Sequence, residues 1–519
     1  MRTGDGIWRA LEQARRDNLA ESGAAAPIAG NWGATRRAVL KALGAGGIAA
    51  LAAPLPAASR GTVAIIGGGI AGLTALHHLT NAGVDARVYE ARKRTGGRMH
   101  TVTQAGVTFE RGGQLVNGDH ADIHALTREF GIALIDRKAD AHRTMIVADG
   151  AVIPEATLAD GLRAIARQID ADAQALDADY ARVAPRFDRL SIAQYLDQHA
   201  ALIPQPWVRH LLEQTSRTEY GVEPGQASAI ELLFNLPVVD GARVEVLGGS
   251  DERFVMAGGS SSLIAALTDR HRERIELGRR PIRVAAAPGG RVTLTFLDLT
   301  TVTVDRVIVA VPASLADQIE YAVPLPTQWR AFLKVMQLGR CEKLQWAMQD
   351  TPWRATLGMG GEGWSADAAG PAALVWEGTV HGGTSSGTPI WNWFFGGDQV
   401  AAEDVALPDP ATLARAFAGI ASGLDSARAE GAAFNRTMWH RDPLTKGAYS
   451  NFPPGQLSRF AGLLSVEGDG APRYSSAGRV VFAGEHLSDA FPGYMNGGAQ
   501  TGRMAAEAVI GRTIAHAAA

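Results

Sequence analysis

The sequence predicts an α/β fold, and three observations support this prediction. The chain has 519 residues, which is long enough for two or three packed domains around one large core. It contains 60 glycines, many of them in short turns beside apolar strands, and this usage is typical of an α/β protein whose backbone approaches a ligand closely. Residues 62–90 contain, in this order, an apolar strand, a glycine-rich turn, a helix and a second strand. This order predicts parallel strands joined through a helix.

The first 58 residues read as an extension that carries an export signal. Residues 35–41, Thr-Arg-Arg-Ala-Val-Leu-Lys, precede a weakly apolar run at 42–55 and small residues at 56–58. A paired arginine, a modest apolar region and a small-residue cleavage site are typical of a twin-arginine signal, which exports folded proteins. An amphipathic helix with two solvated arginines is the alternative interpretation. We therefore expect a periplasmic or secreted protein.

A strand–turn–helix–strand unit follows this extension. Residues 62–66 form a continuous apolar run with β-branched side chains, as a buried parallel strand requires. Residues 67–72, Gly-Gly-Gly-Ile-Ala-Gly, match the spacing G-x-G-x-x-G. Residues 71–82 then show helical periodicity, and residues 87–89 form the next strand, which ends at Glu90. The unit therefore has the order of elements of a dinucleotide-binding βαβ motif.

Each residue type in this motif has a physical task. Gly67 permits the tight turn, Gly69 lets backbone N–H groups approach a pyrophosphate, and Gly72 allows close contact between helix and strand. The positive end of the helix dipole then faces the phosphates. Glu90 lies 18 residues after Gly72, close to the spacing of about 20 expected for the acid that binds ribose hydroxyls. A glycine-rich turn without a ligand is the alternative, and the complete order of elements argues against it.

Charge and cysteine usage exclude several other classes of protein. The net charge is only −3, and positive and negative residues are mixed along the sequence. This charge pattern does not indicate binding to nucleic acid or to an anionic membrane surface. The single cysteine, Cys341, excludes an intramolecular disulfide and a zinc site built on cysteines, and we expect no metal. No stretch of the sequence has the roughly 20 apolar residues of a transmembrane helix.

Two further motifs indicate which dinucleotide is bound. Residues 90–98 read Glu-Ala-Arg-Lys-Arg-Thr-Gly-Gly-Arg. Near the other end, a strand-like run at 479–483 precedes Gly-Glu-His at 484–486, and residues 492–502 read Pro-Gly-Tyr-Met-Asn-Gly-Gly-Ala-Gln-Thr-Gly. These segments resemble the E-A-x-x-x-x-G-G-R and F-A-G-E-H…G-Y-x-x-G-A signatures of the flavin-containing amine oxidases, the superfamily of the monoamine oxidases and the L-amino-acid oxidases. The resemblance spans most of residues 60–515 and implies FAD as the cofactor.

The resemblance also implies a fold of two domains. A Rossmann-type FAD-binding domain would be assembled from residues 60–112, 243–325 and 475–515. A substrate-binding domain of mixed sheet and helices would comprise residues 113–242 and 326–474. The middle of the chain agrees with this division, because it contains strand-like runs at 275–277, 282–284, 292–296 and 307–311.

The residues that the resemblance places around FAD lie in these motifs. Arg98 would pair with the pyrophosphate, and a helix beginning near Met495 would direct its N–H groups at the pyrimidine edge of the flavin. The backbone near Ile282 would meet the adenine. The full expected set is Gly67, Gly69, Ile70, Ala71, Gly72, Glu90, Ala91, Arg92, Gly97, Arg98, Gly113, Gln114, Ile282, Gly484, Glu485, Tyr494 and Met495.

Three residues match catalytic positions of the family. Residues 338–343, Leu-Gly-Arg-Cys-Glu-Lys, resemble the L-G-x-x-x-K segment whose lysine holds a water against flavin N5, which gives Lys343 that role. A surface lysine on a strand is the alternative. Residues 439–449 resemble W-x-x-D-P-x-x-x-G-x-Y, so Tyr449 and Tyr494 match the two tyrosines of an aromatic cage that positions the amine. Simple core packing is the alternative for both rings.

One departure from the family pattern concerns the link to the cofactor. Ala448 stands where covalently flavinylated relatives have a cysteine. Cys341 lies on a different segment, and we do not expect it to supply the linkage. FAD should therefore bind noncovalently.

The resemblance implies an oxidase that takes a hydride from the C–N bond of a primary or secondary amine at flavin N5. The products would be an imine, hydrolysed to an aldehyde or ketone, and hydrogen peroxide from oxygen. The L-amino-acid oxidases usually place an arginine after the Gly-Gly pair. Gln114 follows Gly113 here, which favours amines, although Arg217 or Arg243 could bind a carboxylate. Asn117, Asp119, His120 and Glu231 are further polar residues in stretches that could line a cavity.

Other functions stay open at this point. A dehydrogenase that passes electrons to a quinone or cytochrome fits an exported protein. A flavin-binding protein without turnover is a further alternative, and the set of Lys343, Tyr449 and Tyr494 argues against it. Relatives are often dimers, so a homodimer is one option by analogy.

Overall fold

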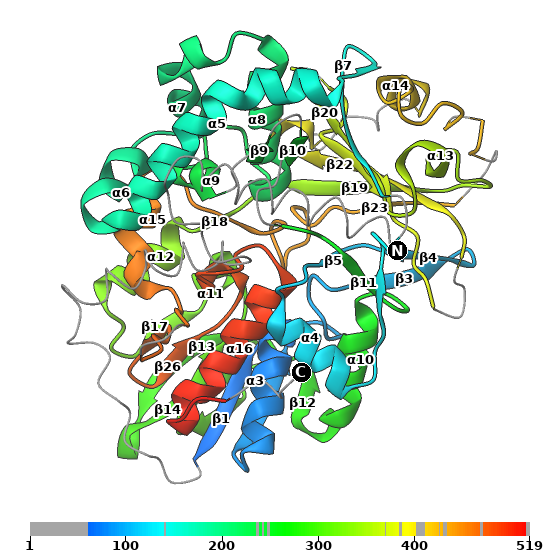
Figure 1. The fold of residues 1–519 in the computed structure, drawn as a ribbon. Helices are drawn as coiled ribbons and strands as arrows, with labels where there is room; N and C mark the ends of the chain where they lie inside the picture. Colours follow the sequence, from blue (N-terminus) through cyan, green and yellow to red (C-terminus); the bar gives the residue numbers. More distant parts are fainter. Residues whose placement is uncertain are drawn as a thin grey trace.

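The computed structural model describes residues 61–514 apart from gaps at 140–141, 235–237, 241–242, 246–249, 369, 383–386, 401–409, 425, 429–432 and 468–470. The expected export signal at 35–58 lies outside the described residues. Helices and strands alternate through several sheets, which confirms the mixed α/β fold class (Figure 1).

A six-stranded sheet contains the βαβ unit expected at residues 62–90. In spatial order its strands are β12 (Ile275–Leu277), β2 (Asp85–Glu90), β1 (Thr62–Ile66), β16 (Arg306–Val309), β26 (Val480–Phe482) and β25 (Ser476–Ala477). Neighbouring strands are parallel except for β25 and β26. The strand expected at 307–311 ends earlier, at Val309, because the chain turns towards Pro312, which has no N–H group for a sheet.

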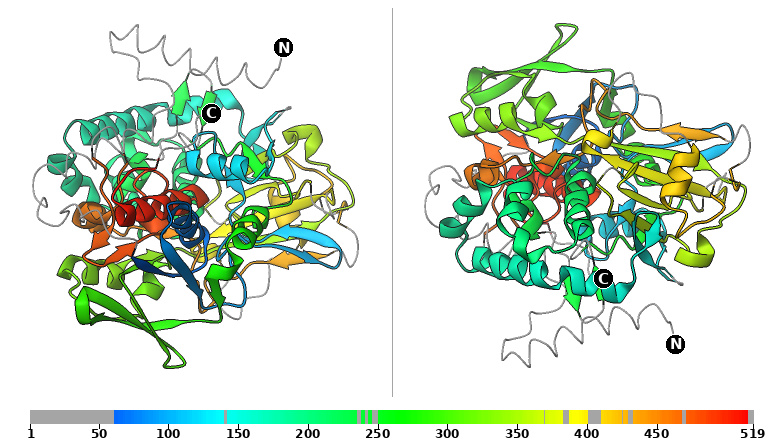
Figure 2. Two further views of the ribbon diagram at one scale, coloured as in Figure 1. Left: turned by 90° about the horizontal axis from the view of Figure 1, so that it is seen from below. Right: turned by 90° about the horizontal axis from the view of Figure 1, so that it is seen from above.

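Two helices from opposite ends of the chain pack together beside this sheet. α3 (Ile70–Asn81) follows β1, and α16 (Met495–Ile510) follows β26, so both expected helices are confirmed. Glycines make the close approach possible, because a Cβ at Gly502 would lie 2.2 Å from the carbonyl oxygen of Ala71. Figure 2 shows the blue α3 and the red α16 side by side near the centre of the molecule.

A seven-stranded sheet forms the second large layer. Its spatial order is β23 (Phe434–Arg436), β19 (Cys341–Ala347), β22 (Ile390–Gly396), β21 (Leu374–Glu377), β20 (Glu362–Ser365), β7 (Thr144–Ala148) and β8 (Ala151–Val152). One face packs against the helical layer that contains α5 (Glu155–Ala178), α8 (Pro206–Tyr220) and α9 (Ala229–Phe234). The other face packs Trp391 and Trp393 against Trp353 and the segments around α13 (Arg354–Leu357) and α14 (Pro410–Ala416). The tryptophan-rich run is therefore mainly core.

Smaller elements connect the two layers. The remaining strands are β3 (Thr101–Gln104), β4 (Val107–Glu110), β5 (Leu115–Val116), β6 (Leu134–Asp136), β9 (Val238–Asp240), β10 (Arg243–Glu245), β11 (Phe254–Met256), β13 (Pro281–Ala287), β14 (Arg291–Phe296), β15 (Thr301–Val304), β17 (Glu320–Ala322), β18 (Gln337–Leu338) and β24 (Ser450–Asn451). The remaining α-helices are α4 (Ala121–Glu129), α6 (Tyr180–Asp188), α7 (Ile192–Gln198), α10 (Ser261–Arg270), α11 (Ala313–Ala316), α12 (Thr327–Val335) and α15 (Gln456–Phe460). Within the described ranges, no helix is both long enough and apolar enough to cross a membrane.

Candidate active site

A cavity of about 450 Å³ extends from the ends of β1 and β2 to the end of α8. Lys343, Tyr449 and Tyr494 line it, and so does every residue expected around FAD except Gly72. The structure therefore brings together segments that lie more than 400 residues apart in the chain. Their roles in binding and catalysis stay predictions.

The glycine-rich turn after β1 leaves open space above its backbone. Gly67 has a φ of +105°, and a Cβ there would lie 2.7 Å from the Val311 side chain. A Cβ at Gly69 would meet no protein atom within 4 Å. Gly72 faces inward, because its Cβ would lie 1.9 Å from the carbonyl oxygen of Gly67. Gly69 thus leaves room for a ligand over the first turn of α3, and Gly72 brings the helix against the strand.

Glu90 is fixed at the end of β2, beside this turn. Its Oε2 accepts a hydrogen bond of 2.7 Å from the Gly68 N–H, and its Oε1 accepts one of 2.7 Å from the Arg92 N–H. The carboxylate lines the cavity. This is the position from which the acid of a dinucleotide-binding unit meets a ribose.

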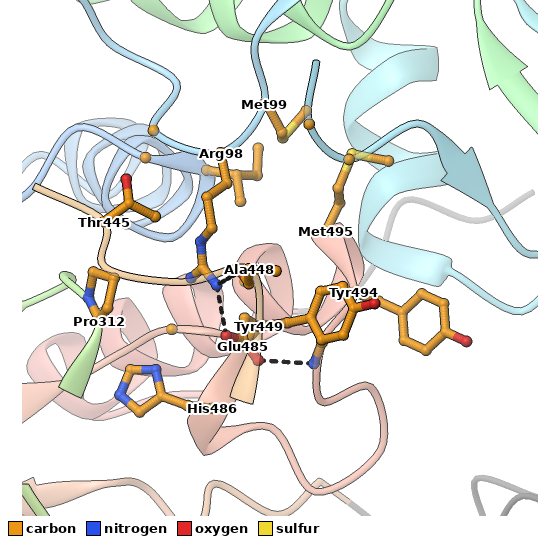
Figure 3. Close-up of a pocket in the computed structure, with 18 of the residues that line it drawn as sticks. Arg98, Met99, Pro312, Thr445, Ala448, Tyr449, Glu485, His486, Tyr494 and Met495 are labelled. Carbon is orange, nitrogen blue, oxygen red and sulfur yellow. Dashed lines mark hydrogen bonds and ion pairs between the residues drawn. The ribbon is translucent and has the colours of Figure 1, made fainter. Parts of the chain in front are cut away.

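An ion pair joins the two signature motifs at the cavity wall. Arg98 Nη1 lies 2.8 Å from Glu485 Oε1 and also donates to the carbonyl oxygen of Ala448 (Figure 3). Glu485 Oε2 accepts further hydrogen bonds from the Gly493 N–H and the Ser450 hydroxyl. Burial alone would raise the pKa of Glu485, but Arg98 and these donors hold it below its usual range. The carboxylate is therefore ionised at neutral pH.

Breaking this ion pair should destabilise the protein and weaken FAD binding. Glu485→Ala leaves the guanidinium of Arg98 without its carboxylate in a largely buried setting, which costs about 3 kcal/mol. We expect a lower thermal midpoint and a larger dissociation constant for FAD. Glu320→Ala is a matched control, because it removes an exposed carboxylate paired with Arg283, and exposed pairs contribute at most about 1 kcal/mol. Equal effects of the two substitutions would contradict the structural importance of the Arg98–Glu485 pair.

Arg92, which was also expected around FAD, has a carboxylate partner within the protein. Its guanidinium binds both carboxylate oxygens of Asp442, at 2.7 and 2.9 Å, and the hydroxyl of Thr445. Arg92 lines the cavity but links two segments of the chain. Its expected contact with FAD stays a prediction.

Lys343 is buried on β19, which rules out the alternative of a surface lysine. Its Nζ donates to the carbonyl oxygens of Gly112 at 2.8 Å and Glu110 at 3.3 Å, and to Gln114 Oε1 at 3.2 Å. Burial lowers the pKa of Lys343 to about 8, against the opposing effect of Glu110. An amine with this pKa can hold or release a proton near neutral pH.

The two tyrosines line the cavity near the end of α8, with their hydroxyls fixed by hydrogen bonds. Tyr449 donates to the carbonyl oxygen of Thr218, and Tyr494 donates to Ser250 Oγ at 3.0 Å. A Cβ at Gly493 would lie 3.7 Å from Tyr449 Cβ, so the residue before Tyr494 abuts the first tyrosine. Both side chains point towards the same space in Figure 3. Burial raises the pKa of each phenol well above 10, so both are neutral.

Cys341 also reaches this end of the cavity. Its Sγ lies 3.0 Å from the Tyr449 hydroxyl oxygen. Burial raises the pKa of the Cys341 thiol to about 12, which keeps it neutral and unreactive as a nucleophile. A covalent bond between this cysteine and a flavin is therefore not favoured.

Acid precipitation should consequently release all FAD from the loaded protein. Ala448 has no group that can bond the flavin ring, and the Cys341 thiol stays protonated. The measurement is the absorbance of FAD in the supernatant and in the pellet. Yellow colour that stays with the pellet would contradict noncovalent binding.

Two carboxylates that were not among the residues expected from the sequence line the cavity near the tyrosines. Glu219 ends α8 just before Tyr220, and Glu252 lies in the segment before β11. Burial and the neighbouring Glu252 raise the pKa of Glu219 to about 8. Burial and Glu362 raise the pKa of Glu252 as well. Neither residue belongs to a motif, so only the fold reveals them.

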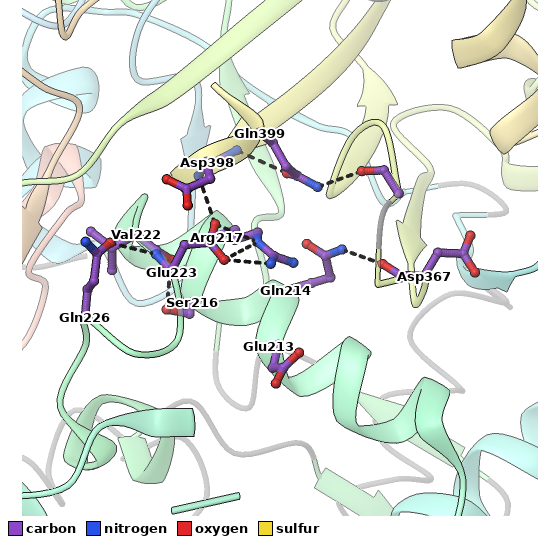
Figure 4. A network of polar contacts seen from close by, with 12 residues as sticks. Glu213, Gln214, Ser216, Arg217, Val222, Glu223, Gln226, Asp367, Asp398 and Gln399 are labelled. Atoms are coloured by element: carbon purple, nitrogen blue, oxygen red, sulfur yellow. Dashed lines mark hydrogen bonds and ion pairs between the residues drawn. The ribbon is translucent and has the colours of Figure 1, made fainter. Parts of the chain in front are cut away.

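The arginines considered for binding a substrate carboxylate do not all reach the cavity. Arg217 forms a bidentate ion pair with Glu223, with the closest atoms 2.7 Å apart, and it does not line the cavity (Figure 4). The side chain of Arg243 lies outside the described residues. Gln114, Asn117 and Asp119 line the cavity as considered, whereas His120 and Glu231 do not.

The fold and the cavity have counterparts among known flavoproteins. The putrescine oxidase structure bound to putrescine superimposes with a TM-score of 0.72 at 21% identity, covering 87% of this chain and 99% of that chain. Cyclohexylamine oxidase from Brevibacterium oxydans superimposes with a TM-score of 0.70 at 21% identity, covering 87% and 98%. The chain therefore has the fold of FAD-dependent amine oxidases.

The sequence places the chain in a family. The model of the family described as flavin containing amine oxidoreductase matches residues 70–510, so the chain belongs to this family and is a flavin amine oxidoreductase that uses FAD. A putrescine oxidase of Kocuria rosea is 24% identical over 481 residues, covering 86% of this chain and 95% of the relative. An L-amino acid dehydrogenase of Synechocystis is 25% identical over 479 residues, covering 86% and 94%.

The residues of the cavity fit this cofactor. The open turn at Gly69, the carboxylate of Glu90 and the N-terminus of α16 provide groups for pyrophosphate, ribose and flavin, respectively. Ile282 lines the cavity at a register shift of β13 between Pro281 and Arg283. Within the described part of the chain, no group of three or more His, Cys, Asp or Glu side chains is arranged to hold a metal ion.

Proposed function

We propose that the protein oxidises the C–N bond of a primary or secondary amine and passes the electrons to oxygen. The product is an imine, which water hydrolyses to an aldehyde or ketone, and oxygen becomes hydrogen peroxide. FAD, when bound, supplies the acceptor for a hydride equivalent. The observation that carries this proposal is the pair Tyr449 and Tyr494, fixed at one end of a buried cavity that also contains Lys343.

The side chains of the cavity have separate tasks in this reaction. Tyr449 and Tyr494 orient the amine, since their hydroxyls are held by Thr218 and Ser250 and the rings cannot swing freely. Trp376 and Phe394 line the same cavity and help to exclude water. Lys343 lies two residues after Cys341 on β19, and we assign it to the reaction with oxygen because it is a buried amine that can exchange a proton near neutral pH.

Oxidation of an L-amino acid is the second candidate, supported by the Synechocystis relative named above. Among the described residues, the arginines that line the cavity are Arg92, Arg98, Arg111 and Arg280. Arg92 and Arg98 bind Asp442 and Glu485, and Arg280 borders Pro281 and Ile282, where we place the adenine. Arg111 lies near Arg94 and His100 and is the arginine of this set that a substrate carboxylate could still meet. Glu219 and Glu252 at the tyrosine end would repel a substrate carboxylate. These features favour amines.

The test is peroxide production by the purified full-length protein on a panel that pairs each amine with its α-carboxylated counterpart. Turnover of amines but not of the matching amino acids supports the proposal. The reverse preference would establish an amino-acid oxidase. Loss of FAD absorbance without peroxide would instead indicate a dehydrogenase that uses a quinone or cytochrome.

We also propose export by the twin-arginine route to the periplasm or the exterior. The support is the sequence at 35–58, with Arg36 and Arg37 as the paired arginines. Replacing both with lysine should leave the FAD-loaded protein in the cytoplasm. Unchanged export of that variant would contradict the proposal.

A further inference from the structure

Three of the carboxylates that line the cavity are held by an arginine or by backbone N–H groups, whereas Glu219 and Glu252 are not. Glu485 pairs with Arg98, and Glu342 pairs with Arg436 at 2.8 Å. Glu90 accepts two backbone N–H groups. In the part of the chain that the structure describes, no lysine or arginine lies within ion-pair distance of the carboxylates of Glu219 and Glu252. Without a cation these carboxylates take up a proton more readily, as their raised pKa values indicate, so a cation that enters the cavity would bind in place of that proton.

Both carboxylates lie next to the hydrogen bonds that fix the tyrosines. Glu219 hydrogen-bonds to Tyr494 and follows Thr218, whose carbonyl oxygen accepts from Tyr449. Glu252 lies two residues after Ser250, the acceptor for Tyr494, and its N–H donates to Asn117 Oδ1 at 3.0 Å. A molecule with its reacting nitrogen between the tyrosines would therefore have both carboxylates within the same cavity.

The chemistry of the reaction requires that this cation is not the nitrogen that is oxidised. Hydride leaves the carbon beside a neutral amine, because its lone pair must form the C=N bond. A carboxylate beside that nitrogen would hold it as an ammonium and oppose the reaction. The carboxylates therefore suit a nitrogen that stays charged throughout. Lys343 cannot take this place, since its Nζ is turned towards Gly112, Glu110 and Gln114.

We propose that Glu219 and Glu252 bind a second, non-reacting ammonium group, so that the substrate is a diamine or a longer polyamine. This inference rests on the amine oxidation proposed above and names its substrate class. One nitrogen lies between Tyr449 and Tyr494 and is oxidised, while the other stays protonated at the two carboxylates. The two residues thereby determine specificity and need not touch the reacting atoms.

The charged groups around Glu219 and Glu252 make the preference for a dication depend on pH. Glu219 faces Glu252, Glu362 and the hydroxyls of Thr218 and Tyr494. Glu252 faces Glu362, Asp251 and, with the opposite sign, Arg137, Lys138 and Lys343. Because burial and these carboxylates raise the pKa of Glu219 to about 8, ionisation increases as the pH rises through 8. The preference for a dication should therefore be larger above pH 8 than below pH 7.

The experiment compares 1,4-diaminobutane with 1-aminobutane, and 1,5-diaminopentane with 1-aminopentane and 5-amino-1-pentanol. The FAD-loaded full-length protein is mixed with each compound without oxygen, and the loss of FAD absorbance gives a dissociation constant and a rate. We expect each diamine to bind about 10- to 100-fold more tightly than its partners, the range of a hydrogen-bonded charge pair. Glu252→Gln and Glu219→Gln should lower the ratio of the monoamine to the diamine dissociation constant towards one.

Glu213→Gln is the matched control, because Glu213 lies on α8 with Glu219 but pairs with Arg209. It should keep the wild-type preference. The FAD spectrum and the thermal midpoint of each variant show that it is folded, and the wild-type comparison alone decides the matter if Glu219→Gln does not fold. Equal binding of diamines and monoamines by the wild type would overturn the inference, and so would equal losses for both in Glu252→Gln. Reduction by L-amino acids but by no amine would instead refute the proposed function.

Discussion

The substitution Lys343→Met should slow the reaction with oxygen about 100-fold or more, as the removal of one preorganised donor does in other active sites. The reaction with amine in the absence of oxygen should change less than about threefold, because the Nζ of Lys343 is bonded to Gly112 and Gln114 rather than to either tyrosine. The two half-reactions are measured separately by stopped-flow absorbance of the FAD. Protonated Lys343 should be the active form, so the oxygen reaction should slow as the pH rises through the pKa of Lys343, about 8.

Two further variants test whether the effect of Lys343→Met is specific to this residue and to its charge. Lys334→Met removes an exposed lysine on α12 by the same chemical change and should leave both half-reactions unchanged. Lys343→Arg keeps a positive charge and should retain the oxygen reaction in part, without the fall near pH 8 because arginine does not deprotonate there. Equal slowing of both half-reactions in Lys343→Met would contradict the role assigned to this residue.

The largest effect on the amine half-reaction is expected from the tyrosines. Tyr449→Leu should lower kcat/KM for the amine about 100-fold, because the loss of a flat ring leaves the reacting nitrogen poorly positioned. Tyr449→Phe keeps the ring and loses only the hydroxyl with its bonds to Thr218 and Cys341, so its effect should be much smaller. The measurement is the anaerobic rate of FAD reduction over a range of amine concentrations.

Comparing Tyr449→Leu with Tyr449→Phe shows whether the ring positions the amine or only packs in the protein core. If the ring acts on the amine, Tyr449→Leu lowers the limiting rate at saturating amine, while the thermal midpoint and the FAD spectrum stay close to those of Tyr449→Phe. Equal rates for the two variants would show that the ring does not position the substrate. The same pair of substitutions at Tyr494 provides an independent repeat.

Local sequence patterns predicted the elements that hold the dinucleotide. The apolar run before Gly67 became β1, and the glycine spacing marked the start of α3. The helix near Met495 was implied by the family resemblance, and α16 begins at that residue. These elements depend on neighbours in sequence, such as the glycines that let helix and strand approach. Local chemistry was therefore sufficient to locate them.

Other parts of the structure depend on contacts between distant segments, which a single sequence does not reveal. The seven-stranded sheet pairs β7 with β20 across more than 200 residues. Arg92 belongs to a recognised motif, yet its partner Asp442 lies 350 residues away. Glu219 and Glu252 belong to no motif, and their proximity to Tyr494 arises only when α8, the segment before β11 and α16 meet. The residues proposed to select the substrate are thus the ones that the sequence indicates least.

The central claim is that this cavity oxidises amines, and an anaerobic titration of the FAD-loaded full-length protein tests it most directly. A diamine, the matching monoamine and an L-amino acid are added separately, and the visible absorbance of FAD is followed. We expect complete loss of absorbance with one equivalent of diamine, whichever acceptor the enzyme uses in the cell. An FAD spectrum that no amine changes, and that an L-amino acid bleaches, would contradict it.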